Sequence, residues 1–152
     1  MRLKLDTRFQ PCPVDDADEL FANGIFVFNV TKLLSRITAN PDRFPVEQVT
    51  VDTLGLTFSV LDQDTVQTAD LSKPIVLAEI APRRFNVIDG NHRIGRARGD
   101  EVSTLPAYRL ACRDHIRFLT SEEGYRSYVE YWNRKVADLA AHELCVARAK
   151  RG

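Results

Sequence analysis

One short segment of this sequence brings together residue types that can hold a negatively charged group. It combines an apolar strand with a short helix that follows at once, and it reads Phe85-Asn-Val-Ile-Asp-Gly-Asn-His-Arg-Ile-Gly-Arg-Ala-Arg-Gly99. Gly90 allows a tight turn between the two elements, and the first N–H groups of a helix have no acceptors within that helix. Because the helix dipole adds partial positive charge at the same end, the turn is a favourable place for an anion.

Side chains of the same segment strengthen this expectation. Arg93 carries a planar guanidinium that matches phosphate oxygens, and His92 can donate a proton near neutral pH. Arg96 follows Arg93 by three residues and lies near it on a helix. From Arg83 to Arg98 five arginines outnumber one aspartate, in a chain whose 21 basic and 21 acidic residues cancel. Positive charge is therefore concentrated around this turn.

A purely structural interpretation of these residues stays open. Aspartate is a preferred N-cap residue, so Asp89 could serve only to cap the helix. Arg93 could pair with an acid on a neighbouring element, and His92 could be a buried side chain with an ordinary hydrogen bond.

The run Val-Ile-Asp-Gly-Asn-His-Arg-Ile-Gly-Arg-Ala is followed by Leu-Pro-Ala-Tyr and preceded by Lys73-Pro-Ile-Val-Leu. Over about residues 73 to 110 this pattern resembles the ParB N-terminal/sulfiredoxin-like superfamily. The resemblance implies binding of ATP or another nucleoside triphosphate together with Mg²⁺. It implies Asp89 and His92 as catalytic residues and Asp89 as a metal ligand. It also implies a set of binding residues, namely Gly90, Asn91, His92, Arg93, Arg96 and Lys73.

Two departures from the family pattern limit what can be carried over. Sulfiredoxins hold ATP phosphates on a Gly-Cys-His-Arg turn and use its cysteine for redox chemistry, whereas Asn91 stands at that position here, so sulfiredoxin activity is not expected. The Asp-Gly-x-His-Arg turn of the free serine kinases is closer. The family's second phosphate-contacting group is not identifiable; Lys73 and Thr68 are candidates, and Glu79 is a weaker candidate for a general base.

Three functions stay open from the sequence. The first is a nucleotide-binding protein that hydrolyses or transfers a phosphoryl group, a reaction that depends mainly on positioning and charge neutralisation. The second is a DNA-binding protein or ParB-like nuclease that uses Arg83, Arg84, Arg96 and the basic tail; zero net charge argues against it. The third is a non-catalytic interaction module that binds a partner through its C-terminal helices, which burial of Arg93 in an internal salt bridge would favour.

Composition sets the frame for these hypotheses. The 152 residues are 44% apolar and 28% charged, as in an ordinary globular domain rather than a collagen-like, coiled-coil or disordered chain. Cys12, Cys112 and Cys145 are too few and too far apart for a disulfide framework or a zinc cage. The first ten residues lack the apolar core of a signal peptide, and no apolar run approaches the roughly 20 residues of a membrane span. We expect a cytoplasmic chain with no membrane partner.

The periodicity predicts one α/β (α+β) domain over residues 1–152, a small mixed β-sheet flanked by helices, with residues 111–152 as a helical C-terminal extension. Segment 10–23 is expected to be loop or a short helical turn, and segment 62–73 is polar and has no strong period. Helices are predicted at 31–39 and 91–98, the latter with Gly99 as its C-cap. Strands are predicted at 2–9, 25–29, 48–52, 56–61, 74–81, 85–89 and 105–110, with 48–52 and 56–61 forming a hairpin.

The C-terminal extension has its own pattern. Thr120-Ser-Glu-Glu123 fits a capping box at a helix start. Apolar residues then recur at helical spacing and are expected to face the core, namely Tyr125, Tyr128, Val129, Trp132, Val136 and Leu139. From residue 134 onward five basic residues outnumber two acidic ones, and this tail is expected to be a frayed, solvated end.

Overall fold

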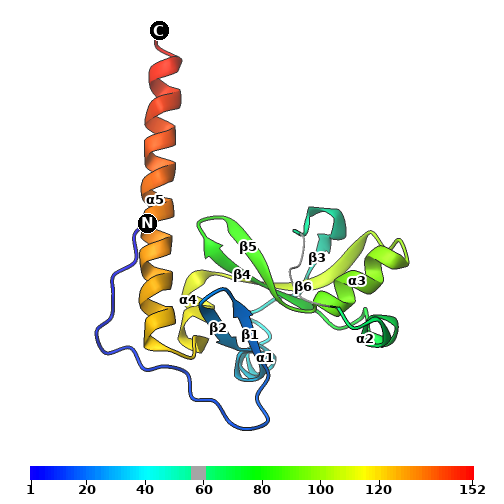
Figure 1. Cartoon of the computed structure of the whole chain (residues 1–152). Coiled ribbons are helices and arrows are strands. Elements are labelled where there is room, and N and C mark those ends of the chain that lie inside the picture. Colours follow the sequence, from blue (N-terminus) through cyan, green and yellow to red (C-terminus); the bar gives the residue numbers. More distant parts are fainter. Residues whose placement is uncertain (56–60) are drawn as a thin grey trace.

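A computed structural model describes residues 1–55 and 61–152 of the chain. Its centre is a four-stranded sheet in the order β3-β6-β4-β5 (Figure 1), made of Glu47–Thr50, Thr104–Leu110, Ile75–Ala81 and Arg84–Asp89. β4 runs parallel to β6, while the β3–β6 and β4–β5 pairs are antiparallel. The predicted mixed sheet with flanking helices and a C-terminal helical extension is therefore confirmed.

The strand β4 is the interior of this sheet. Ile75, Val76, Leu77 and Ala78 are all buried, because β5 and β6 pair with its two edges and other elements cover both faces. A strand buried on both faces has an uninterrupted apolar sequence instead of an alternating one. The predicted strands at 74–81, 85–89 and 105–110 are all confirmed.

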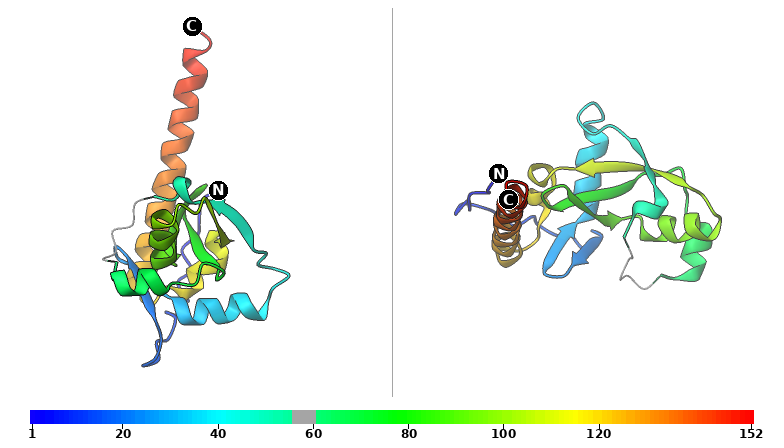
Figure 2. Two further views of the ribbon diagram at one scale, coloured as in Figure 1. Left: turned by 90° about the vertical axis from the view of Figure 1, so that its right-hand side faces the viewer. Right: turned by 90° about the horizontal axis from the view of Figure 1, so that it is seen from above.

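One face of the sheet is covered thoroughly. Val76, Ala78 and Ile80 belong to the larger core cluster, which also contains side chains of α1 (Val30–Ala39) and the first half of α5 (Glu122–Ala149). Figure 2 shows these two helices against the sheet.

The opposite face is covered at one end by a single helix of nine residues, α3 (Asn91–Gly99). Ile94 and Ala97 of this helix pack with Ile75, Leu105 and other residues at one end of the sheet. The predicted helix at 91–98 is thus confirmed. Its expected glycine cap is wrong, because Gly99 is the last residue of the helix and Asp100 is the C-cap, whose N–H donates to the Arg96 carbonyl.

A separate hairpin precedes α1. β1 (Leu20–Asn23) and β2 (Phe26–Asn29) are antiparallel around Gly24, whose φ of +64° suits a glycine. Asn29 then caps α1 by accepting a hydrogen bond from the Lys32 N–H. The strand predicted at 25–29 and the helix at 31–39 are confirmed, but β1 lies in a segment predicted to be irregular.

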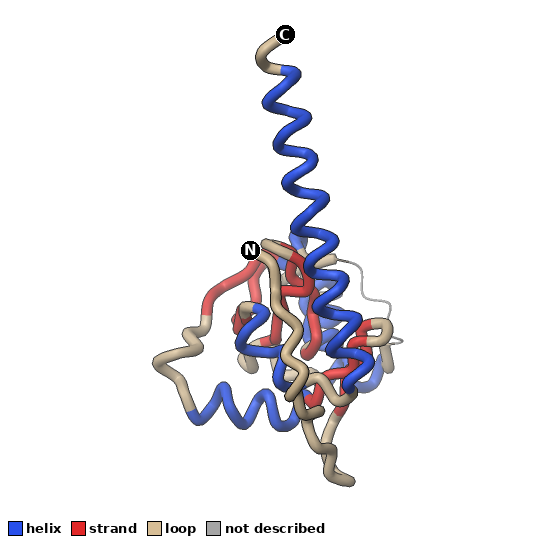
Figure 3. The backbone as a smooth tube through the Cα atoms, turned by 90° about the vertical axis from the view of Figure 1, so that its left-hand side faces the viewer, coloured by secondary structure: helices blue, strands red, loops and turns tan. Residues whose placement is uncertain are grey.

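The strand predicted at 2–9 is wrong. Leu3 exchanges hydrogen bonds with the Asn133 side chain of α5, its N–H donating to Oδ1 at 2.7 Å and its carbonyl accepting from Nδ2 at 2.9 Å. The Trp132 indole donates to the Met1 carbonyl, and Phe9 stacks on Tyr125 with ring centroids 3.9 Å apart. The alternating segment therefore lies along a helix (Figure 3), whose side chains replace the partner strand.

The middle of the chain was predicted only in part. The strand predicted at 48–52 is confirmed over its first residues by β3, which pairs with β6 and ends at Thr50, whereas Val51–Thr53 is a turn of 3₁₀ helix. The strand predicted at 56–61 lies mostly outside the described residues, so its hairpin with 48–52 stays a prediction. Segment 62–73, for which no regular element was predicted, contains the helix α2 (Gln63–Thr68), which starts where the Asp62 side chain accepts from the Thr65 N–H.

The C-terminal region is helical, as predicted. α4 (Cys112–His115) and the 3₁₀ turn Ile116–Phe118 lead to α5. Its cap is Ser121 and not Thr120, because the Ser121 hydroxyl accepts from the Gly124 N–H while Thr120 donates to the Val27 carbonyl.

The predicted apolar stripe of α5 is only partly internal. Tyr125, Tyr128, Val129 and Trp132 are buried as expected, but Leu139 is exposed. The tail is solvated as predicted, yet it is helical to Ala149 and not frayed. Across the described part of the chain, none of the helices combines the length and apolar character that crossing a bilayer would require.

A buried histidine joins α4 to the sheet. The His115 Nε2 atom lies 2.8 Å from the Glu79 carbonyl, to which the Tyr128 hydroxyl also donates at 2.7 Å. Burial in an apolar environment disfavours the charged imidazolium and lowers the pKa of His115 to about 4.

We expect this histidine to make folding stability depend on pH. Above about pH 6.5 the His115 side chain is neutral in both the folded and the unfolded state. Between about pH 6.5 and pH 4 the unfolded chain binds a proton that the folded chain does not bind. The free energy of unfolding therefore falls as the pH falls, by about 3 kcal/mol in total. Urea denaturation of the wild type across this range should show that slope, and His115→Gln should lose it. An equal slope in both proteins would contradict the assignment.

Candidate functional site

The turn between β5 and α3 is built around Gly90. This residue has φ +102° and ψ +19°, and a Cβ atom placed on it would lie 2.4 Å from Cγ2 of Ile75. Only glycine fits both the backbone conformation and the space. Gly90 is also the N-cap, and no side chain caps the helix, so the structural interpretation of Asp89 as an N-cap is wrong.

Arg93 is bonded inward. Its Nη2 atom donates to Oδ2 of Asp89 at 3.0 Å, and its Nη1 atom donates to the Pro74 carbonyl at 3.0 Å and the Lys73 carbonyl at 3.3 Å. Both side chains of the ion pair are only 16% exposed. The guanidinium thus ties the end of β5 to the start of β4. Its predicted role as a phosphate ligand stays a prediction, and it would require these bonds to be exchanged.

Other predicted site residues lie on the α2 side of α3. The His92 Nε2 atom accepts from the Asp62 N–H at 3.4 Å. Arg96 donates to the Ala69 carbonyl at 2.6 Å and pairs with Asp100 at 3.3 Å. Thr68 donates to the Asp64 carbonyl within α2. The predicted site residues therefore lie close together around the turn. The side chains of Arg93 and Arg96, however, are hydrogen-bonded to other groups of the protein.

Two further candidates are placed as follows. Lys73 is exposed next to the turn and contributes its carbonyl to Arg93. The Glu79 carboxylate accepts from the backbone N–H groups of Arg83 at 2.9 Å and Cys112 at 3.4 Å. The structure thus gives Glu79 a role in holding the β4–β5 turn to α4.

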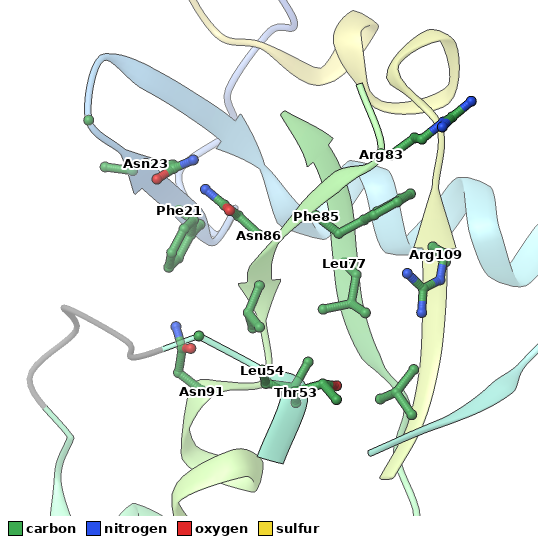
Figure 4. Close-up of a pocket in the computed structure, with 15 residues that line it drawn as sticks. Phe21, Asn23, Thr53, Leu54, Leu77, Arg83, Phe85, Asn86, Asn91 and Arg109 are labelled. Carbon is green, nitrogen blue, oxygen red and sulfur yellow. The ribbon is translucent and has the colours of Figure 1, made fainter. Parts of the chain in front are cut away.

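A pocket of about 650 Å³ lies on the part of the sheet that α3 leaves open (Figure 4). Leu77, Phe85 and Val87 of β4 and β5 line it, as do residues of the β1–β2 hairpin and of the segment after β3. The remaining lining residues are Phe21, Ala22, Asn23, Gly24, Val49, Thr53, Leu54, Gly55, Arg83, Asn86, Asn91 and Arg109. The pocket lining therefore combines apolar and aromatic groups with amides and guanidinium groups.

Positive charge borders this pocket at two places. Arg83 and Arg109 lie toward one end, and Asn91, the first residue of α3, lies toward the other (Figure 4). The helix N-terminus adds partial positive charge there. The lining residues within the described chain include no aspartate or glutamate. An anionic ligand would therefore meet two guanidinium groups at one end, of which Arg109 is paired with Glu47, and the positive end of a helix dipole at the other.

Arg109 is held in place by two neighbours. Its guanidinium lies 4.8 Å from the centre of the Phe85 ring, and its Nε atom pairs with the Glu47 carboxylate. These contacts fix Arg109 at the pocket edge and leave part of its fork toward solvent, where the side chain is 44% exposed. A cation stacked on an aromatic ring is also pre-oriented for planar partners.

Of the predicted residues, Asn91 and Arg83 line the pocket; Arg83 was predicted only as a DNA contact. Arg84 is exposed and is not a lining residue. The sequence analysis missed Phe21, Asn86 and Arg109. The one available signal was the alternation of the strand at 105–110, which places Arg109 on the same face as Leu105 and Ala107.

The described residues include no group of three or more His, Cys, Asp or Glu side chains placed to hold a metal ion. Asp89, the predicted Mg²⁺ ligand, is paired with Arg93. The residues present therefore do not by themselves form a magnesium site, and the predicted Mg²⁺ remains untested.

Comparison of the chain with protein-family models, with curated proteins and with solved structures gave no match. The resemblance of residues 73–110 to the ParB N-terminal/sulfiredoxin-like superfamily therefore stays a prediction.

The turn geometry makes a direct prediction for two glycines of the same helix. Gly90→Ala should destabilise the fold by about 3 kcal/mol, because it combines backbone strain with overpacking against Ile75. Gly99→Ala meets no atom within 4 Å and should stabilise the helix by about 0.5 kcal/mol. Chemical denaturation measures both changes, and equal effects would contradict the role assigned to Gly90.

Proposed function

We propose that this chain binds a phosphorylated small molecule, with a nucleoside triphosphate as the favoured class, in the pocket beside the 89–93 turn. The observation that carries the proposal is the combination of Arg83, Arg109 and the α3 N-terminus around one concave site whose described lining residues include no carboxylate. Guanidinium groups and exposed helix N–H groups are the protein's standard partners for phosphate oxygens.

The rest of the pocket suits the organic part of such a ligand. The Phe21 and Phe85 side chains offer aromatic surface, and Asn23, Asn86 and Asn91 offer amide donors and acceptors. A volume of about 650 Å³ is in the range of small-molecule and cofactor sites. A planar base or sugar can therefore be accommodated together with phosphates.

Binding of the phosphorylated ligand does not require catalysis. Arg93 supports it indirectly, since the guanidinium holds the turn that places Asn91 at the pocket. Hydrolysis or transfer of a phosphoryl group, with Asp89 and His92 as catalytic residues, is the further step that the resemblance implies. It needs the Asp89 carboxylate to be released from Arg93.

We further propose a cytoplasmic location, which the free thiols of Cys12, Cys112 and Cys145 support.

A non-catalytic interaction module is the second candidate, and a specific observation favours it. Arg93 is engaged in an internal salt bridge, as expected for a turn that serves only the architecture. DNA binding has less support, because Arg96 is bonded to Ala69 and Asp100 and the exposed arginines of the β4–β5 turn are only two.

Calorimetric titration with ATP, CTP, tripolyphosphate and adenosine, each with and without Mg²⁺, tests the proposal. We expect a nucleoside triphosphate to bind more tightly than either of its parts. Arg83→Ala and Arg109→Ala should each weaken binding about tenfold or more, the usual size of a lost charge-assisted hydrogen bond.

Arg84→Ala is the matched control, because it removes the same charge one residue away from a lining position. It should leave the affinity within about twofold. Absence of heat with every compound, or equal losses in the Arg83 and Arg84 variants, would remove the proposal and leave the interaction module.

A further inference from the structure

The turn between β4 and β5 has an uncommon backbone conformation. Pro82 and Arg83 are its two central residues, and they lie between Ala81 and Arg84, which pair with each other. Arg83 has a φ of +61°, in the left-handed region that L side chains seldom adopt. A proline followed by a residue with positive φ is the arrangement of a type II turn, in which the second position is usually glycine or asparagine. An arginine there makes the turn less stable than a glycine would.

The Glu79 carboxylate holds this turn in place. Its Oε1 atom accepts a hydrogen bond from the Arg83 N–H at 2.9 Å, and its Oε2 atom accepts from the Cys112 N–H at 3.4 Å. The carbonyl of the same residue accepts from the Tyr128 hydroxyl at 2.7 Å. Cys112 and Tyr128 belong to the larger core cluster. Through Glu79 the turn is therefore anchored to the core of the protein as well as to its own two strands.

The side chain of Arg83 takes no part in this anchoring. None of the ion pairs among residues 1–55 and 61–152 includes Arg83. The residue is exposed and lines the pocket toward the same end as Arg109 (Figure 4). Left-handed residues other than glycine persist only where the surrounding structure holds them, and they gather at binding sites. The unfavourable turn thus presents a free guanidinium at the pocket.

We propose that Glu79 is a positioning residue of the pocket, which holds the β4–β5 turn in its left-handed conformation so that Arg83 meets the phosphate of the ligand. This role rests on the proposed function, because Arg83 needs a phosphorylated ligand to act upon. A carboxylate that merely lay near the site would have the opposite effect, since a negative charge weakens the binding of an anion. The direction of the effect at Glu79 therefore separates positioning from proximity.

Replacement of Glu79 by glutamine tests the positioning. Glutamine has the same size but offers one acceptor oxygen, whereas the N–H groups of Arg83 and Cys112 use two. We expect Glu79→Gln to bind ATP about fivefold more weakly in a calorimetric titration, although it removes a negative charge. Circular dichroism of the same samples shows whether the fold is retained.

A double-mutant cycle shows whether this effect passes through Arg83. In the Arg83→Ala background, Glu79→Gln should change the affinity for ATP by less than about twofold, because no guanidinium remains to be positioned. The Arg84→Ala background is the matched control. It removes the same charge from the neighbouring position, which is not part of the pocket lining, and there Glu79→Gln should keep its full effect.

The strain of the turn is measured without ligand. Arg83→Gly should raise the equilibrium constant for folding about fivefold in urea denaturation, and it should weaken ATP binding as much as Arg83→Ala does. Glu101 offers a matched control, because it is also exposed and has a φ of +55° but is not a lining residue of the pocket. Glu101→Gly should give a similar gain in stability and leave the affinity for ATP unchanged.

The outcomes separate this role of Glu79 from the proposed function. A wild type that binds neither ATP nor any other compound of the calorimetric panel removes both. If the wild type binds, unchanged or tighter binding by Glu79→Gln overturns the positioning role alone, and so does an undiminished effect in the Arg83→Ala background. An Arg83→Gly variant no more stable than the wild type also overturns it, and that measurement does not depend on whether Glu79→Gln folds.

Discussion

The four-stranded sheet has two apolar faces, and the helices packed against it cover one face more completely than the other. α1 and the first half of α5 bury the first face, whereas α3, at nine residues, is about 13 Å long. It covers the end of the sheet near Ile75 and Leu105. The open remainder becomes the pocket. The candidate site is open because α3, the helix that connects β5 to β6, is too short to cover this whole face of the sheet.

The position of α3 depends on the contacts of one guanidinium. Arg93 bonds Asp89 and the carbonyls of Lys73 and Pro74, so the same side chain fixes the end of β5, the start of β4 and the first turn of α3. Gly90 has a positive φ and no Cβ atom, so the helix can begin next to Ile75, where a side chain would clash. Through these contacts Asn91 reaches the pocket. The residues that suggested a phosphate-binding turn therefore position a site next to it.

The spacing of apolar residues along the chain correctly predicted elements whose pattern reflects burial of the element itself. The apolar strand at 74–81 and the helix at 31–39 belong to this group. The pattern failed at 2–9, because the alternating side chains face helix α5 and not another strand. The pocket was not predictable in the same way, since Phe21, Phe85 and Arg109 come from distant segments that only the tertiary fold brings together. Arg93 was recognised as important, but two of its three partners are the backbone carbonyls of Lys73 and Pro74, which carry no sequence signal.

The fold thus presents an open pocket on the sheet, lined in part by Arg83 and Arg109, and a long helix whose second half is exposed and projects from the body of the protein (Figure 1). Only the pocket carries the proposed function. The most direct test is an amide ¹H–¹⁵N correlation spectrum recorded while a nucleoside triphosphate is added. The account predicts shifts confined to the pocket, at Phe21, Asn86, Asn91 and Arg109, with residues 134–149 unchanged. A spectrum that does not change, or changes only along α5, would contradict it.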